Sequence, residues 1–168
     1  MTLSDHIAVM RDGRLVQFGT QEEIYRRPRD TYVATFVGKP RMGLVEGELR
    51  VDGEVVRLEA EGLSIPLGSA ASLGITGEAP SGITVGVRAE DVRVHVDEAG
   101  SASSFPASVA LLEPVGSDTF VELAVGPATI VARVSPDLPL QLGQPVRAEL
   151  VPGRVHLFDR DAGLRLAA

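Results

Sequence analysis

The sequence predicts a mainly β protein, a small OB-like barrel of short strands preceded by a β-hairpin and two short helices. Three observations support this prediction. Short apolar runs recur along the chain, turn-forming residues separate them, and helical periodicity is confined to the first forty residues. The chain has 168 residues, with 18 Gly and 11 Pro, and 44% of it is apolar. This composition is typical of many short strands joined by tight turns, and the length suits one domain or one domain with an appendage.

The chain opens with the pattern of a β-hairpin. An apolar run from Ile7 to Met10 is followed by Arg11-Asp12-Gly13 and then by a second apolar run from Leu15 to Phe18. Asp-Gly between two apolar runs favours a hairpin, because Gly tolerates the positive φ that such turns need.

Two short helices are predicted next. Thr20 and Glu23 have the spacing of a capping box, so a helix should begin at Thr20 and end before Pro28. Asp30 should cap the second helix, which Gly38 can close and Pro40 cannot continue. The second helix places its apolar residues on one face, at Tyr32, Val33, Phe36 and Val37.

From residue 41 onward the pattern changes to short β-like runs. Residues 49–51 and 55–58 read as a hairpin around Asp52-Gly53, and the Pro in residues 63–67 suggests an edge strand. Loops are expected at 68–82 and 97–104. The remaining strands are expected at 83–87, 92–96, 109–112, 120–125, 129–134, 146–151 and 155–158, with turns at Gly126-Pro127 and Pro152-Gly153. We therefore divide the chain into residues 1–40 and a barrel domain of residues 41–168.

A weak repeat runs through the second part. Gly82, Val85, Arg93, Val94 and His95 recur 61 residues later, as Gly143, Val146, Arg154, Val155 and His156. We interpret this as two related β-modules that each end in the same kind of strand.

Composition excludes several classes of function. The formal net charge is −7 and no basic run is longer than Arg26-Arg27, so nucleic acid is not an expected partner. The sequence has no Cys, which excludes disulfides and thiolate metal sites. No apolar stretch is long enough to span a bilayer, and charges interrupt any signal-peptide pattern in the first twenty residues.

Four segments resemble one known family. Residues 1–42, MTLSDHIAVMRDGRLVQFGTQEEIYRRPRDTYVATFVGKPRM, resemble the last segment of the nucleotide-binding domain of ABC importer ATPases of the carbohydrate branch, the maltose and glycerol-3-phosphate type. VGVRAEDVRV (85–94) is similar to the family's Gly-x-Arg-Pro-Glu motif, with Ala89 where Pro is usual. ALLEPVGSDTFVEL (110–123) is similar to its Glu-x-x-Gly-x-x-Thr element, and RVHLFDRDAGLRL (154–166) to its closing strand and tail.

This resemblance implies that residues 41–168 are a TOBE-type regulatory and dimerisation domain. It implies a homodimer on the cytoplasmic side of the membrane, held there through the importer's membrane subunits, and a soluble regulator as a further partner. In that family the switch histidine would lie just before this stretch. ATP and Mg would belong to the nucleotide-binding domain, and we expect no cofactor or metal in this chain.

ATP hydrolysis by this chain alone is not expected. P-loop enzymes need G-x-x-x-x-G-K-[ST], but the sequence has a single lysine, Lys39, and Pro40 follows it. The chain alone is therefore predicted not to be an enzyme, whereas the parent would be a transport ATPase.

Candidate binding residues fall into two groups. The first is an expected regulatory or dimer rim, for which the competing interpretation is solvated turns with internal ion pairs: Arg88, Glu90, Asp91, Glu113, Gly116, Ser117 and Asp118. The second is an apolar patch expected to pack on the nucleotide-binding domain and, without it, to fold back on the barrel or exchange with another copy: Ile7, Val9, Leu15, Phe18, Tyr32, Val33, Phe36 and Val37.

Two other functions remain open from the sequence. TOBE-type modules in related importers and storage proteins bind oxyanions such as molybdate or sulfate at subunit interfaces, for which Ser117, Thr119 or Ser72 are candidates. His95 and His156 would meet if the two modules packed symmetrically, and a His pair can bind metal. Isolated histidines in polar surroundings at strand ends are the favoured interpretation.

Overall fold

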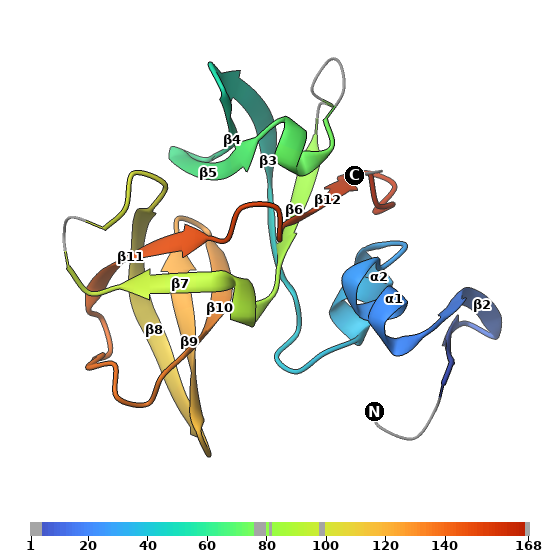
Figure 1. Ribbon diagram of the computed structural model, residues 1–168, viewed down its shortest axis with the longest axis horizontal. Coiled ribbons are helices and arrows are strands. Elements are labelled where there is room, and N and C mark those ends of the chain that lie inside the picture. The colour runs from blue at the N-terminus through green and yellow to red at the C-terminus, as the bar shows by residue number, and fades with distance from the viewer. Residues whose placement is uncertain (1–4, 76–79, 81, 98–99, 167–168) are drawn as a thin grey trace.

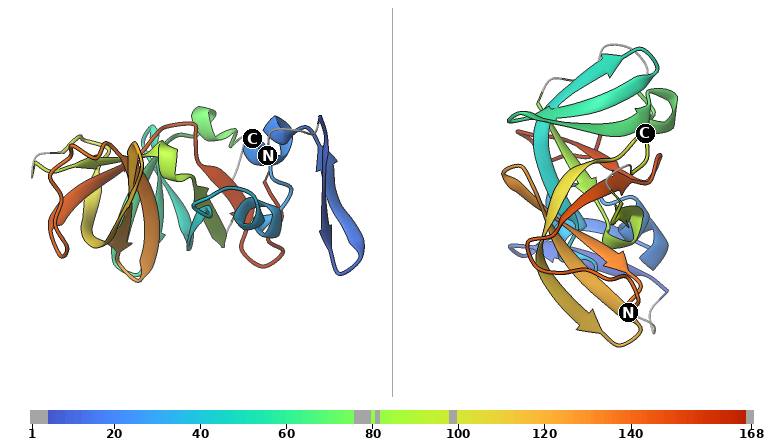
Figure 2. Two further views of the ribbon diagram at one scale, coloured as in Figure 1. Left: turned by 90° about the horizontal axis from the view of Figure 1, so that it is seen from below. Right: turned by 90° about the vertical axis from the view of Figure 1, so that its left-hand side faces the viewer.

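A computed structural model describes residues 5–75, 80, 82–97 and 100–166. The first part of the chain forms the hairpin β1 (Ile7–Arg11) and β2 (Arg14–Gly19), followed by the helices α1 (Gln21–Arg26) and α2 (Thr31–Phe36). In Figures 1 and 2 this hairpin stands at one end of the molecule, beyond the helices and away from the barrel. Among the described helices, none is long and apolar enough to cross a membrane.

Local sequence accounts for these first elements. Asp12 and Gly13, both at positive φ, make the two-residue turn between β1 and β2. The capping box at α1 is complete: the Thr20 hydroxyl accepts from Glu23 N at 3.2 Å, and the Glu23 carboxylate accepts from Thr20 N at 2.8 Å. The Asp30 side chain caps α2 by accepting from Val33 N at 2.8 Å. The predicted hairpin and both helices are therefore confirmed.

The rest of the chain folds into two five-stranded sheets. The first has the order β12-β6-β3-β4-β5 and the second the order β10-β9-β8-β11-β7. The strands of the first sheet are β3 (Gly43–Asp52), β4 (Val55–Ala60), β5 (Leu63–Ser69), β6 (Ile83–Val87) and β12 (His156–Asp159). Those of the second are β7 (Val92–His95), β8 (Phe105–Val115), β9 (Asp118–Val125), β10 (Ala128–Val134) and β11 (Pro145–Leu150). Two 3₁₀ turns, η1 (Ala71–Leu73) and η2 (Ala89–Asp91), follow β5 and β6.

The two sheets are built from equivalent modules that exchange their last strands. Strands β3 to β6 of one module correspond to β8 to β11 of the other, in the same order within each sheet. The next strand of each module crosses over, so that β7 pairs with β11 and β12 pairs with β6. Residues of both sheets form one large apolar cluster, which includes Leu58, Val85, Phe105, Leu123 and Ala148. The predicted mainly β, OB-like fold of two related modules is thus confirmed.

Two predicted turns need correction, and two predicted loops lie partly outside the described residues. Asp52 pairs with Val55, so the turn residues are Gly53 and Glu54, one position later than expected. Pro152-Gly153 joins strands of different sheets and is not a hairpin turn. The predicted loop 68–82 contains the end of β5 and η1, while residues 76–79 and 81 lie outside the described residues, as do 98–99 of the second predicted loop. Edge position is confirmed for β5, which stands last in its sheet, the kind of strand in which a proline is tolerated.

Candidate functional site at the junction of the two segments

Arg88 joins the helical segment, which here means the hairpin and the two helices within residues 5–40, to the barrel. It follows β6 directly and its side chain is buried, with 2% of the residue exposed. Its Nη2 donates to Tyr25 O at 2.9 Å, and its Nη1 donates to Val37 O at 2.6 Å and to Ala34 O at 3.4 Å. These carbonyls lie at the carboxyl ends of α1 and α2, where a helix leaves acceptors unpaired and favours positive charge. One guanidinium therefore satisfies the ends of both helices from the barrel side.

Tyr25 completes this contact. The guanidinium of Arg88 lies over the Tyr25 ring, 3.8 Å from its centroid, and the Tyr25 hydroxyl donates to the carboxylate of Glu90 in η2. Burial, with the hydrogen bond to Glu90, raises the pKa of Tyr25 to about 12. The hydroxyl therefore stays protonated at neutral pH and acts as a fixed donor across the junction.

The carboxy-terminal tail makes a second connection. Backbone bonds run from Thr31 N to Gly163 O at 2.9 Å and from Arg165 N to Arg29 O at 2.8 Å. The Arg165 Nη1 donates to Arg26 O at 2.9 Å and lies 3.3 Å from His156 Nδ1. Sequence reasoning did not single out Arg165, because nothing in its local pattern distinguishes it from a surface arginine. The only available signal was the resemblance of residues 154–166 to a family tail.

The seven rim candidates do not form one site. Arg88 lies inside the junction, because the open carbonyls of two helices give its guanidinium partners away from water, so the competing interpretation of a solvated turn is wrong for this residue. Its role for a dimer or a regulator stays a prediction. Glu90 and Asp91 stand beside Arg88 in η2. The other candidates, Glu113, Gly116, Ser117 and Asp118, lie at the far end of the β8–β9 hairpin, where Asp118 pairs loosely with Arg133 at 3.9 Å.

The apolar patch divides into two parts. Val9, Val33 and Val37 are buried in a small cluster with Ile24. These side chains are covered within residues 5–40 themselves, since the hairpin and helices close on each other. Ile7 and Tyr32 border this cluster, whereas Leu15, Phe18 and Phe36 are more than half exposed, at 55%, 62% and 66%.

The residues predicted for oxyanion binding, and the two histidines considered for a metal site, do not lie together within this chain. Ser72 in η1 donates to Ser69 O at 2.7 Å, whereas Ser117 and Thr119 lie at the β8–β9 end, with Ser117 beside the Asp118 carboxylate. His95 and His156 lie on different sheets: His95 bonds Glu149 and His156 contacts Arg165. Within the described residues, no group of three or more His, Asp or Glu side chains has the arrangement of a metal site.

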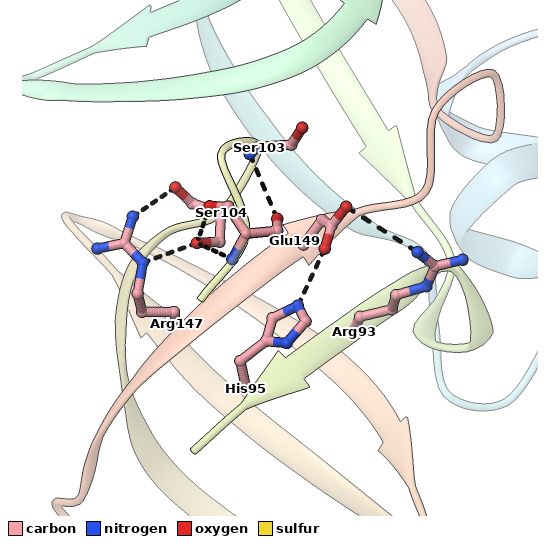
Figure 3. A network of polar contacts seen from close by, with 7 residues as sticks. Arg93, His95, Ser103, Ser104, Arg147 and Glu149 are labelled. Carbon is pink, nitrogen blue, oxygen red and sulfur yellow. Dashed lines mark hydrogen bonds and ion pairs between the residues drawn. The ribbon is translucent and has the colours of Figure 1, made fainter. Parts of the chain in front are cut away.

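A second polar network lies on the other sheet (Figure 3). Glu149 is 8% exposed, and its carboxylate lies 2.9 Å from His95 Nε2 and 3.9 Å from Arg93 Nη1. Burial alone would raise the pKa of Glu149, but hydrogen bonds from His95 and Ser101 and the charge of Arg93 hold that pKa below its usual value. Glu149 stands 61 residues after Arg88, at the equivalent position of the second module. The two modules therefore carry opposite buried charges at one position, and only the arginine faces the helices.

Comparison with known proteins first indicates the class of domain present in the barrel. The TOBE domain family matches residues 85–158. Among solved structures, the cytoplasmic molybdate-binding protein ModG superposes with a TM-score of 0.52 over 68% of this chain and 93% of its own, at 19% sequence identity. That likeness extends to the fold alone.

Longer relatives match nearly the whole chain. The chain is 36% identical over 95% of its length to the sulfoquinovosyl glycerol transport ATP-binding protein SmoE of Agrobacterium fabrum, covering 43% of that protein. It is 33% identical over 99% of its length to the sn-glycerol-3-phosphate import ATP-binding protein UgpC of Yersinia pestis, covering 44% of that protein. Over almost its whole length the chain is therefore similar to ATP-binding proteins of sugar- and glycerol-phosphate-type ABC importers, and part of it matches the TOBE domain family. It spans less than half the length of these relatives.

Proposed function

We propose that this chain is the regulatory and dimerisation region of an ATP-driven, sugar-type ABC importer ATPase. The observation that carries the proposal is the Arg88 junction. A buried barrel arginine there holds the ends of α1 and α2, in the segment that resembles the end of a nucleotide-binding domain. The helices and the barrel would therefore move together as one rigid body. ATP and Mg would be bound by other parts of the importer ATPase, and this chain by itself would hydrolyse no ATP.

The proposal extends to an assembly with other parts of the importer. Leu15, Phe18 and Phe36 supply the exposed apolar surface on the helical segment, which is suited to packing against a catalytic domain. The barrel would contact its copy in a second subunit and would offer a docking surface to a soluble regulator. Through the membrane subunits of the importer, the whole would sit at the inner face of the cell membrane.

Self-association of the chain tests this proposal. Sedimentation of the purified chain, from low to high micromolar concentration, should show a monomer–dimer equilibrium. The matched control carries Leu15→Ser and Phe18→Ser, which remove the two most exposed apolar side chains of the hairpin. If residues 41–168 form the dimer, the control should associate as the parent chain does. A strictly monomeric chain, or association that disappears in the control, would contradict dimerisation through the barrel.

A further inference from the structure

A cavity of about 330 Å³ lies beside the Arg88 junction. Its walls come from three parts of the chain: α1, the η2 turn after β6, and the segment that leads into β12 with the tail. A volume near 300 Å³ is at the lower end of the range for small-molecule sites. Its basic lining residues are Arg26, Arg88, Arg154, His156 and Arg165.

Positive charge is concentrated around this cavity. Four of the sixteen basic residues of an acidic chain line it, against two carboxylates, Glu90 and Asp91, which leaves an excess of two positive charges. The Glu90 carboxylate already accepts the Tyr25 hydroxyl. Burial, and then the neighbouring Glu90, raise the pKa of Asp91 above its usual value.

The residues of the cavity wall also include a buried donor without an acceptor. Arg88 is buried and uses Nη1 and Nη2 on helix carbonyls, but its buried Nε has no hydrogen-bond partner among the described residues. A buried N–H that is left unpaired costs free energy, so this part of the cavity wall is not fully satisfied by the protein itself. His156, 8% exposed, has its Nδ1 facing the Arg165 guanidinium, so the proton of the neutral ring belongs on Nε2, as a further donor.

We propose that this cavity binds a small dianion of the phosphate class, either free phosphate or a short phosphate monoester. Planar guanidinium groups bind phosphate oxygens through paired, charge-assisted hydrogen bonds, and the arginines here approach from both sides of the junction. A bound dianion would bridge Arg26 of α1 and Arg154 of the barrel, and would brace the helices against the sheets. That a ligand regulates transport in this way rests on the proposed function, whereas binding itself does not.

Calorimetric titration of the full chain tests the proposal, with inorganic phosphate and glycerol 2-phosphate as separate probes at constant ionic strength. The test variant is Arg154→Gln, because Arg154 is exposed and lines the cavity. The matched control is Arg50→Gln, an exposed arginine on β3 away from the cavity. Affinity should fall about tenfold or more in Arg154→Gln, the effect of one charge-assisted hydrogen bond, and stay unchanged in the control. The probe that binds more tightly distinguishes free phosphate from an ester.

An NMR titration of His156 in the parent chain gives an independent readout. Burial and the charges of Arg165 and Arg88 lower the pKa of His156 to about 4. An anion held in the cavity, which near pH 4 is the singly charged form of either probe, would offset those charges and raise that pKa measurably. The proposal is overturned if neither probe binds saturably up to about 10 mM. Equal affinity of the parent chain and Arg154→Gln, or saturable binding that leaves the His156 titration unmoved, would also overturn it. None of these results depends on whether the chain dimerises.

Discussion

Replacement of Arg88 by Ala should uncouple the helical segment from the barrel. The variant loses two short hydrogen bonds from a charged donor, to Tyr25 O and Val37 O, and the contact of the guanidinium with the Tyr25 ring. The third bond, at 3.4 Å to Ala34 O, is too long to add much.

The expected magnitude follows from these contacts. A hydrogen bond to a charged group contributes about 1.5–3 kcal/mol, so two of them contribute about 3–6 kcal/mol. Part of this is offset, because the variant no longer desolvates a guanidinium. We expect a net loss of roughly 3 kcal/mol, equivalent to about a hundredfold increase in the opening equilibrium of the junction. The loss of stability in Arg88→Lys should lie between zero and that of Arg88→Ala, because lysine keeps the positive charge but not the planar guanidinium group.

Amide hydrogen exchange locates the effect, because it measures opening segment by segment. In Arg88→Ala, exchange should accelerate by about two orders of magnitude in α1 and α2, while β8 and β9 keep their protection. Arg50→Ala, an exposed substitution on β3, should change neither region by more than about 0.5 kcal/mol. Unchanged exchange in the helices, or an equal loss of protection in the β8–β9 hairpin, would refute the role assigned to Arg88.

Two further predictions concern the barrel and its pH dependence. Gly47 lies where β3 changes partner from β6 to β4, and a Cβ there would meet Glu59 O at 2.5 Å, so Gly47→Ala should cost about 1–3 kcal/mol. Gly43→Ala, whose Cβ would meet nothing closer than 3.4 Å, should cost less, and similar melting temperatures for the two variants would contradict this reasoning. The lowered pKa of His156, about 4 against 6.5 for an exposed histidine, means that the fold favours the neutral ring. The contribution of His156 to the free energy of unfolding is complete above pH 6.5 and falls by on the order of 3 kcal/mol as the pH drops toward 4. Urea denaturation across that range should show this slope in the parent chain but not in His156→Gln; identical slopes would assign it to other groups.

Local sequence determined most of the individual elements. The Thr20–Glu23 capping box, the Asp30 cap and the Asp12-Gly13 turn act between residues a few positions apart, so their effects can be predicted without the rest of the fold. The same holds for the alternating apolar runs that became strands. The 61-residue repeat indicated two modules, and the four quoted segments indicated the family.

The candidate site was predicted only in part, because its contacts are long-range. Arg88 was recognised as one of three charged residues between two strands, but its partners, Tyr25, Ala34 and Val37, lie more than fifty residues earlier. No local pattern reports which carbonyls are left unpaired at the end of a distant helix. For the same reason Arg165 was missed.

The sequence by itself thus specified most of the strands, the helix caps, the repeat and the resemblance to importer ATP-binding proteins. Only the tertiary structure decided that β7 and β12 exchange sheets and that Arg88 is buried while its counterpart Glu149 bonds a histidine. The physical reason is that a strand's pattern gives its buried face but not its neighbour. Whether a charged side chain is solvated or buried depends on which unpaired groups the packed chain brings beside it.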